Sequence, residues 1–335
     1  MATTASTEPL APPSGTDPSV AFNRAAGLGR YMKRNPSIIA GSVMLGIIVL
    51  FWAFGTIMTA PEDAKDLAFA PPNKKPSLQN PHPCYTSENP RELCFAYDNV
   101  ERQHLLGTDR LGKDILASFS QGIPQTVMIG LIAGSLGTVV GTLLAFAAGY
   151  YGGVLDATIR FVVDTLQTIP GILILIIITI AWREVGGGEM TFIQLSLIIA
   201  MLAWLGPTRV VRSQVLVMKQ RSYVEMARLS GMSGPEVIVK EMMPNLMPFI
   251  VANFVLAVSS AILASIGLEA LGLGDFSSNT LGMMIYHNIW YGSLVNGWWW
   301  WWSPPIVVIV ILFIGLFMLS RGMDEWANPR LRRRF

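Results

Sequence analysis

Residues 126–150 read TVMIGLIAGSLGTVVGTLLAFAAGY and contain no charged side chain. A helix needs about 20 consecutive apolar residues to cross a membrane, because unpaired backbone N–H and C=O groups are too costly in hydrocarbon. Four glycines in this stretch recur every three or four residues, so they share one face of a helix that another helix can approach closely. They are Gly130, Gly134, Gly137 and Gly141. The stretch predicts a spanning helix packed against other helices.

Five further stretches have the same apolar character. They are 37–60, 161–182, 190–208, 245–268 and 304–320. Only the second of these contains a charge, Asp164, and Pro170 and Pro207 are expected to kink the spans that contain them. The sequence therefore predicts an all-α polytopic membrane protein with six transmembrane helices.

The composition fits a chain that is solvated mostly by lipid. Hydrophobic residues make up 52% of it and charged residues 14%, whereas soluble domains have about 25% charged residues. The net charge of +2 and the lack of a basic stripe with interleaved aromatic residues argue against a nucleic-acid partner.

The distribution of Lys and Arg predicts the orientation of the chain, because cytoplasmic loops carry the excess of these residues. The three basic regions are Arg24 to Arg34, Arg209 to Lys240 and Arg321 to Arg334. We therefore expect both termini in the cytoplasm. The predicted organisation is a disordered cytoplasmic segment (1–35), a six-span domain (36–320) with an outer loop (61–124) and a cytoplasmic loop (209–244), and a basic cytoplasmic tail (321–335).

The outer loop contains the two cysteines of the chain, Cys84 and Cys94. Thiols outside the cytoplasm oxidise and persist as disulfides, so we expect a Cys84–Cys94 bridge rather than two free thiols or a metal site. The five tryptophans at 298–302 precede the sixth span, where we expect an aromatic belt at the membrane surface rather than a ligand-stacking site.

The outer loop also contains GTDRLGKD at 107–114, which is close to the frame of a phosphate-binding loop. Asp114 stands where that loop needs Ser or Thr, and no strand precedes it, so we interpret the match as accidental. The apolar residues that follow, from Ile115 to Ile123, have helical spacing and predict a short helix along the outer membrane surface.

The cytoplasmic loop contains SYVEMARLSGMSGPEVIVKEMMPNLMP at 222–248. Glu225 lies in a predicted short helix that Gly231 ends by adopting a positive φ. A second helix is expected after Ser233 as N-cap, with Pro235 in its first turn, and Pro244 is expected to mark re-entry into the membrane. Two short helices joined by a bend suit docking into a groove on a partner; an ordinary interfacial loop is the alternative.

This loop resembles the EAA motif of ABC importer permeases, in which Glu-Ala-Ala is followed by a spaced Gly and a terminal Pro. Glu225, Ala227, Gly231 and Pro244 hold the matching places, while Met226, Glu241 and Met243 replace motif residues. The segments LGTDRLGKDILA, AGYYGGVLDATIRFVVDTLQTIP and GLEALGLG, with the tail MDEWANPRLRRRF, are similar to the C-type permease subunit of oligopeptide and dipeptide importers.

The resemblance implies a type I ABC importer permease fold in a bacterial-type inner or plasma membrane. It implies a second homologous permease subunit, two ATPase subunits or domains, and an extracytoplasmic substrate-binding protein as partners. ATP and Mg would be held by the ATPases, with no cofactor on this chain. The residues expected to contact or support the ATPase are Arg221, Tyr223, Glu225, Ala227, Arg228, Gly231, Met232 and Pro244.

Other charged or adaptable side chains of the spans are candidates for substrate contact. Arg160 and Asp164 are four residues apart, and we favour a structural ion pair over a substrate contact. Glu269 either meets a peptide amino group or lies solvated at the membrane boundary, and Met201 is a candidate path residue. The three histidines lie in no catalytic or metal-binding frame, so we expect no enzymatic activity.

The resemblance implies the permease subunit of an ATP-driven importer of oligopeptides or dipeptides, which forms half of the translocation path. Nickel complexes or oligosaccharides, which related permeases carry, are the alternative cargo. An ion-coupled secondary transporter is the competing class. Such transporters place ionisable residues at mid-membrane, and the centres of these spans are nearly free of charge.

Overall fold

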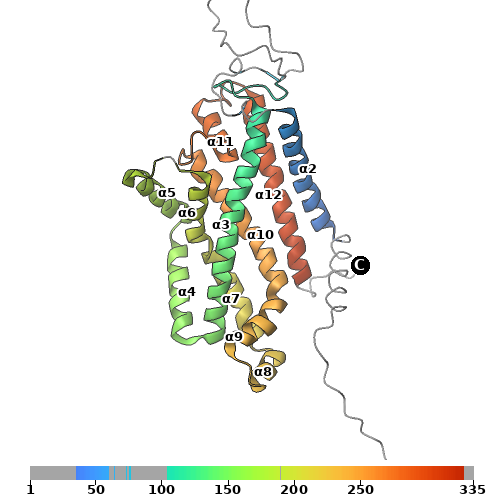
Figure 1. Cartoon of the computed structure of the whole chain (residues 1–335), viewed down its shortest axis with the longest axis vertical. Coiled ribbons are helices and arrows are strands. Elements are labelled where there is room, and N and C mark those ends of the chain that lie inside the picture. The colour runs from blue at the N-terminus through green and yellow to red at the C-terminus, as the bar shows by residue number, and fades with distance from the viewer. Residues whose placement is uncertain are drawn as a thin grey trace, which may run out of the picture.

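The computed structural model describes residues 35–59, 64, 73, 75–76, 104–188 and 190–327. This part of the chain forms an elongated bundle of helices and contains no named β-strand. Figure 1 shows the bundle upright, with α11 (Leu281–Trp290) near one end and α8 (Ser222–Leu229) at the other. We call these the α11 end and the α8 end.

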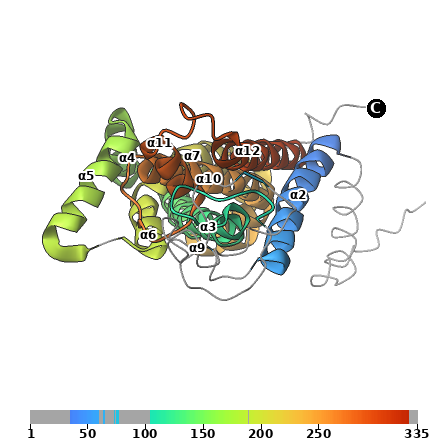
Figure 2. The ribbon, with the colours of Figure 1, turned by 90° about the horizontal axis from the view of Figure 1, so that it is seen from above.

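Helix α2 (Pro36–Met58) lies along one side of the bundle against α12 (Trp299–Ala327). It begins where the Asn35 side chain accepts a hydrogen bond from the Ser37 amide at 3.0 Å, with Pro36 in the first turn. In the view from above, α2 and α5 (Gly171–Trp182) lie on opposite sides of the central helix α3 (Ile115–Tyr151) (Figure 2).

Helix α3 (Ile115–Tyr151) is continuous, so the predicted short helix on the membrane surface is wrong. Pro124 has no N–H to donate to the carbonyl of Ser120, and the indole Nε1 of Trp52 donates to that carbonyl instead, at 3.0 Å. This contact with α2 satisfies the carbonyl that the proline leaves unpaired. The loop that was expected to reach residue 124 therefore ends before Ile115.

The glycine face of α3 allows close helix packing, as the sequence predicted. A Cβ atom at Gly134 would lie 2.8 Å from the backbone of Val258 in α10 (Met243–Ala270). A Cβ atom at Gly137 would lie 2.7 Å from the backbone of Ala203 in α6 (Phe192–Ala203). One stripe of glycines thus brings α3 against both α10 and α6.

The third predicted span is bent rather than straight. Helix α4 (Gly153–Thr168) and the segment from Gly171 to Gly186 meet at an angle of 85°. The break contains Pro170, which cannot continue the hydrogen-bond ladder of α4 and disfavours helical geometry at Ile169. The predicted kink is confirmed, and at 85° it makes this pair of helices a broken span or a re-entrant loop.

The fourth span is also in two parts, α6 and α7 (Leu205–Lys219), which meet at Trp204. Pro207 is at the third position of α7, where its missing N–H costs no helical bond. The chain then forms α8 and turns into α9 (Gly234–Glu236), the π-helical segment η3 (Val237–Met242) and α10.

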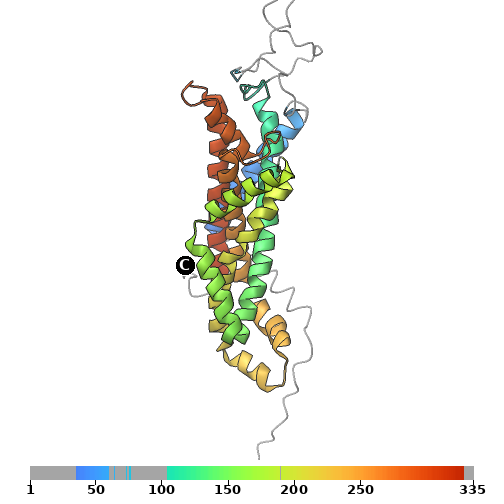
Figure 3. The ribbon, with the colours of Figure 1, turned by 90° about the vertical axis from the view of Figure 1, so that its left-hand side faces the viewer.

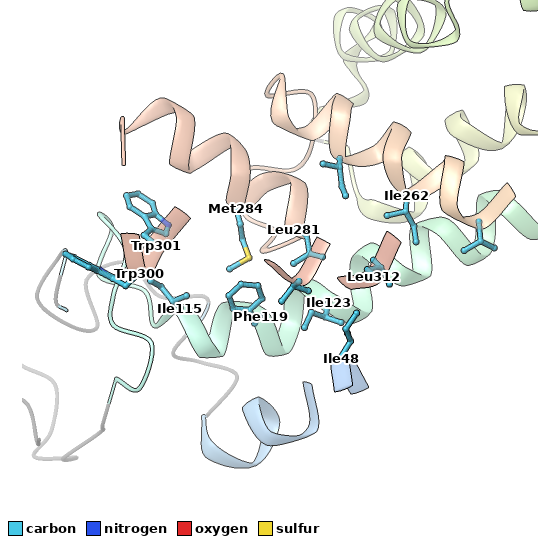
Figure 4. Close-up of a cluster of buried hydrophobic side chains, with 13 residues drawn as sticks. Ile48, Ile115, Phe119, Ile123, Ile262, Leu281, Met284, Trp300, Trp301 and Leu312 are labelled. Carbon is cyan, nitrogen blue, oxygen red and sulfur yellow. The ribbon is translucent and has the colours of Figure 1, made fainter. Parts of the chain in front are cut away.

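The buried residues at the α11 end form a core between α2, α3, α10, α11 and α12 (Figure 4). Trp300 and Trp301 belong to this core, so the expectation of an aromatic belt is wrong for them. Successive residues of a helix point about 100° apart, so five tryptophans in a row cannot all face lipid. Trp299 is the exposed large side chain of the run.

The helices are consistent with the six predicted spans when the bent pair α4 and α5 is taken as one span. Five are long and apolar enough to cross a membrane, and the bent pair α4 and α5 makes up to six. The N-terminal segment before Asn35, the tail after Ala327 and both cysteines, Cys84 and Cys94, lie outside the described residues.

Candidate functional site

The α8 helix ends in the bend that the sequence predicted. Gly231 has φ +83°, a conformation that costs glycine little and other residues more. Its amide donates to the Arg228 carbonyl at 3.0 Å, and the Met232 amide donates to the Ala227 carbonyl at 3.2 Å. These two bonds close the C-terminus of α8 and reverse the chain direction.

The chain after the bend differs from the expected second short helix. Residues Gly234 to Ala270 form one continuous helical run through η3, so the chain is helical on both sides of Pro244. Ser233 occupies the N-cap position, but its side chain makes no capping hydrogen bond. The second arm of the bend is therefore the beginning of a span. We call α8, the turn at 230–233 and α9 the elbow.

One face of α8 anchors the elbow to the bundle. Val224 and Ala227 are buried in a cluster with Val211 and Val215 of α7 and Met242 of η3. Ala227, expected at the ATPase contact, therefore packs inward instead. Burial also raises the pKa of the partly buried Tyr223, which packs against the same cluster.

Basic side chains brace the elbow against the end of α3. The guanidinium of Arg228 lies 4.6 Å from the ring centre of Tyr150, a cation–π distance. The ammonium of Lys219 donates to the Tyr150 carbonyl at 2.6 Å. Arg228, although exposed, thus braces the elbow through Tyr150, and Met232 is partly buried beside the cluster under α8.

Helix α8 projects from the end of the bundle (Figure 3), and its opposite face is exposed. It presents Glu225 beside two large apolar side chains, Met226 at 63% exposed and Leu229 at 82% exposed. Arg221, Gly231 and Pro244 are exposed as well. Sequence reasoning missed Met226 and Leu229, although the spacing of the buried Val224 and Ala227 leaves both on the outward face.

Residues 117–333 match the family described as binding-protein-dependent transport system inner membrane component. The chain belongs to this family. The resemblance to ABC permeases of oligopeptide and dipeptide importers is thereby confirmed. This permease is a multi-pass membrane protein.

Three curated relatives extend the comparison. The oligopeptide transport system permease protein OppC of Mycobacterium tuberculosis (strain ATCC 25618 / H37Rv) is 31% identical over 57% of this chain and 69% of its own length. The dipeptide transport system permease protein DppC of Bacillus subtilis (strain 168) is 28% identical over 69% and 70%. The glutathione transport system permease protein GsiD of Shigella dysenteriae serotype 1 (strain Sd197) is 34% identical over 57% and 61%.

The GTDRLGKD segment of this permease forms a closed turn before α3. One carboxylate oxygen of Asp109 accepts hydrogen bonds from the amides of Leu111 and Lys113, both at 2.8 Å. Asp114 caps α3 through the Ala117 amide at 2.9 Å. The amides that a phosphate loop would offer to a nucleotide are thus occupied by Asp109.

The same turn is joined to the chain before α11. The Asp114 carboxylate lies 2.6 Å from Nδ1 of His104, and Lys113 Nζ donates to Asn279 Oδ1 at 3.5 Å. Burial raises the pKa of Asp109 to about 6 and lowers that of Lys113. This network holds the start of α3 against the start of α11.

The sequence left two alternatives for Glu269, contact with a peptide amino group or a solvated membrane boundary, and the structure supports neither. Its side chain is 1% exposed, near Gly274 and Gly282, where an added Cβ would lie 2.9 Å and 2.3 Å from it. A carboxylate enclosed in this way is neither solvated nor accessible to a substrate. Met201, the other candidate path residue, is 60% exposed on the outer surface of α6.

The ion pair expected between Arg160 and Asp164 is replaced by another. Arg212 of α7 donates through Nε and Nη2 to the two carboxylate oxygens of Asp156, which lies one turn earlier on α4. Within the described residues, Arg160 and Asp164 form no ion pair with each other. The bidentate geometry of Arg212 with Asp156 ties α4 to α7 across the bundle.

Proposed function

We propose that this chain is the permease subunit of an ATP-driven importer of peptides. It would form half of a translocation path with a second homologous permease subunit. Two ATPase subunits or domains would bind at the elbow, and an extracytoplasmic binding protein would deliver the peptide at the α11 end. The chain itself would be non-catalytic, with ATP and Mg held by the ATPases.

The exposed face of α8 is the observation that carries this proposal. Met226 and Leu229 expose apolar surface at the tip of the bundle, and Glu225 adds a charge beside them. An apolar helix face in a groove, with a charged residue that sets the orientation, is a common mode of protein recognition. Val224 and Ala227 anchor the opposite face, so motion of the ATPases would reach the bundle through α8.

The proposed cargo follows from the relatives. Their names specify oligopeptides, dipeptides and glutathione, which share a peptide bond or a peptide-like backbone. The basic residues of the elbow region and of the chain after α12 support a cytoplasmic α8 end in a bacterial-type inner membrane. Both termini would then be cytoplasmic.

Leu229→Asp tests the docking surface without disturbing the fold, because this side chain is 82% exposed. We expect the ATPase subunits to be lost when the transporter is purified in mild detergent, while the second permease subunit is retained. Val295→Asp is the matched control: it introduces the same charge at a residue that is 92% exposed, near the α11 end. Retention of the ATPases and of peptide uptake in the Leu229→Asp variant would contradict the proposal.

Glu225→Gln separates the charge of the elbow from its shape. The side chain is exposed, so the amide preserves the helix while removing the negative charge. We expect slower peptide-stimulated ATP hydrolysis in the assembled transporter at unchanged amounts of bound ATPase. Unchanged hydrolysis would show that Glu225 has no part in coupling.

A further inference from the structure

The last turn of α3 lies in the bend of the elbow. Tyr150 is 8% exposed and shares a buried cluster with Val224 and Ala227 of α8. The guanidinium of Arg228 lies over its ring, 4.6 Å from the ring centre. A Cβ atom at Gly234, the first residue of α9, would lie 3.0 Å from the ring atom Cε1. Both arms of the elbow therefore meet one side chain of α3.

Further contacts fix Tyr150 in this position. Lys219, the last residue of α7, donates from Nζ to the Tyr150 carbonyl at 2.6 Å, and its ammonium lies 5.9 Å from the ring centre. The ring of Tyr151 packs edge-on against that of Tyr150, with the ring centres 5.2 Å apart. Because an aromatic ring is rigid, it cannot yield by changing shape. A displacement of the elbow must therefore carry Tyr150 with it or break these contacts.

Helix α3 is in close contact with other spans, so a displacement of its end would reach them. Its glycine face lies against α10 at Gly134 and against α6 at Gly137. At Gly149, next to Tyr150, an added Cβ would lie 2.7 Å from Cγ1 of Val215 in α7. Close-packed interiors have few voids and transmit such displacements.

We infer that Tyr150 is the positioning residue through which the elbow moves α3. The inference rests on the proposed function, in which the ATPases bind at the elbow. It adds a route from α8, through Arg228 and the Tyr150 ring, into a span that is distant from α8 in the sequence. Helices α7 and η3 are joined to the elbow by the chain itself, whereas the response of α3 depends on side-chain contacts.

The test measures hydrogen exchange in the purified pair of permease subunits, with and without the ATPase subunits. Exchange in α8 (222–229) reports ATPase binding, and exchange at the end of α3 (146–151) reports transmission. Tyr150→Leu removes the ring, and Tyr150→Phe keeps it. Phe146→Leu is the matched control, because Phe146 lies one turn earlier on α3 and is buried in the same cluster. Within the described part of the chain, no basic side chain lies over the Phe146 ring.

ATPase binding should slow exchange in α8 equally in the unmodified protein and in all three variants. At the end of α3 it should slow exchange roughly two- to fivefold, the equilibrium effect of one cation–π contact. We expect this slowing in the unmodified protein, in Tyr150→Phe and in Phe146→Leu, and its absence in Tyr150→Leu. A residue with only a packing role would alter the basal exchange of α3 but not its response to the ATPases.

Arg228→Gln tests the same route without opening a cavity, because Arg228 is an exposed residue. It should roughly halve the response at the end of α3 while the slowing in α8 is retained, and Arg228→Lys should restore the response because the cation is kept. Loss of the α8 slowing in Arg228→Gln would place Arg228 in the ATPase contact instead and would contradict the inferred route.

An unchanged response at the end of α3 in Tyr150→Leu would overturn the inference. So would an equal loss in Phe146→Leu, since general packing would then explain the response. Slowing in α8 without slowing in α3 of the unmodified protein would remove the route and leave the proposed function standing. Absence of slowing in α8 of the unmodified protein would overturn the proposed function, and the inference with it.

Discussion

Gly134→Ala should destabilise the bundle, although alanine is the better helix former. The added Cβ would lie 2.8 Å from the backbone N and Cα of Val258, whereas carbon atoms pack at about 3.5–4.0 Å. Backbone atoms cannot rotate away, so α3 and α10 must separate by about 1 Å, and such overpacking costs about 1–3 kcal/mol. The higher helix propensity of alanine offsets at most about 1 kcal/mol of this loss in stability.

Gly46→Ala is the matched control, because a Cβ at Gly46 in α2 meets no atom within 4 Å. This substitution should be neutral or stabilise the protein by up to about 1 kcal/mol. Titration of the detergent-solubilised chain with a denaturing detergent measures both free energies of unfolding. The reasoning is refuted if Gly134→Ala is as stable as Gly46→Ala, since close packing would then not explain the glycine face.

Three further predictions concern the turn before α3, the loop after α10 and the elbow. Because the pKa of Asp109 is raised to about 6 in the folded protein, the free energy of unfolding should fall as pH rises from 3.8 through about 6. Asp109→Asn should remove this pH dependence, which unfolding titrations at several pH values measure. Arg183 donates to the carbonyls of Gly272 at 3.2 Å and Gly274 at 2.7 Å. Arg183→Lys loses this fork and should cost about 1.5–3 kcal/mol, seen as faster hydrogen exchange in residues 271–280. Gly231→Ala should lower the free energy of local opening of α8, measured by hydrogen exchange, by roughly 1–2 kcal/mol, because alanine disfavours positive φ. A smaller decrease in Gly231→Asn would support this explanation, since asparagine adopts positive φ more readily.

The sequence was sufficient to predict the spans, because the cost of unpaired backbone groups in lipid leaves long apolar runs few alternatives. It was also sufficient to predict the bend at Gly231, since few residues other than glycine adopt positive φ. The continuity of α3 through Pro124 was not predictable, because it depends on an indole from α2. The sharp break at Pro170 depends likewise on which neighbours each half of the span meets.

The candidate site was predictable in position but not in detail. Spacing placed Arg160 and Asp164 within reach of each other, but it could not reveal the competing contact between Arg212 and Asp156, which are 56 residues apart. Glu269 has the sequence position of an accessible boundary residue, and only the packing of the chain at 274–282 encloses it. Distant contacts of this kind leave no local pattern.

The uninterrupted helix from Gly234 to Ala270 has a mechanical consequence. Its 37 residues form a rod about 55 Å long, anchored by the elbow at one tip and by the enclosed Glu269 at the other. A tilt of about 5° would sweep the far tip through about 5 Å. In the proposed importer, such a tilt would carry the segment that encloses Glu269 along with the rod, without bending any span.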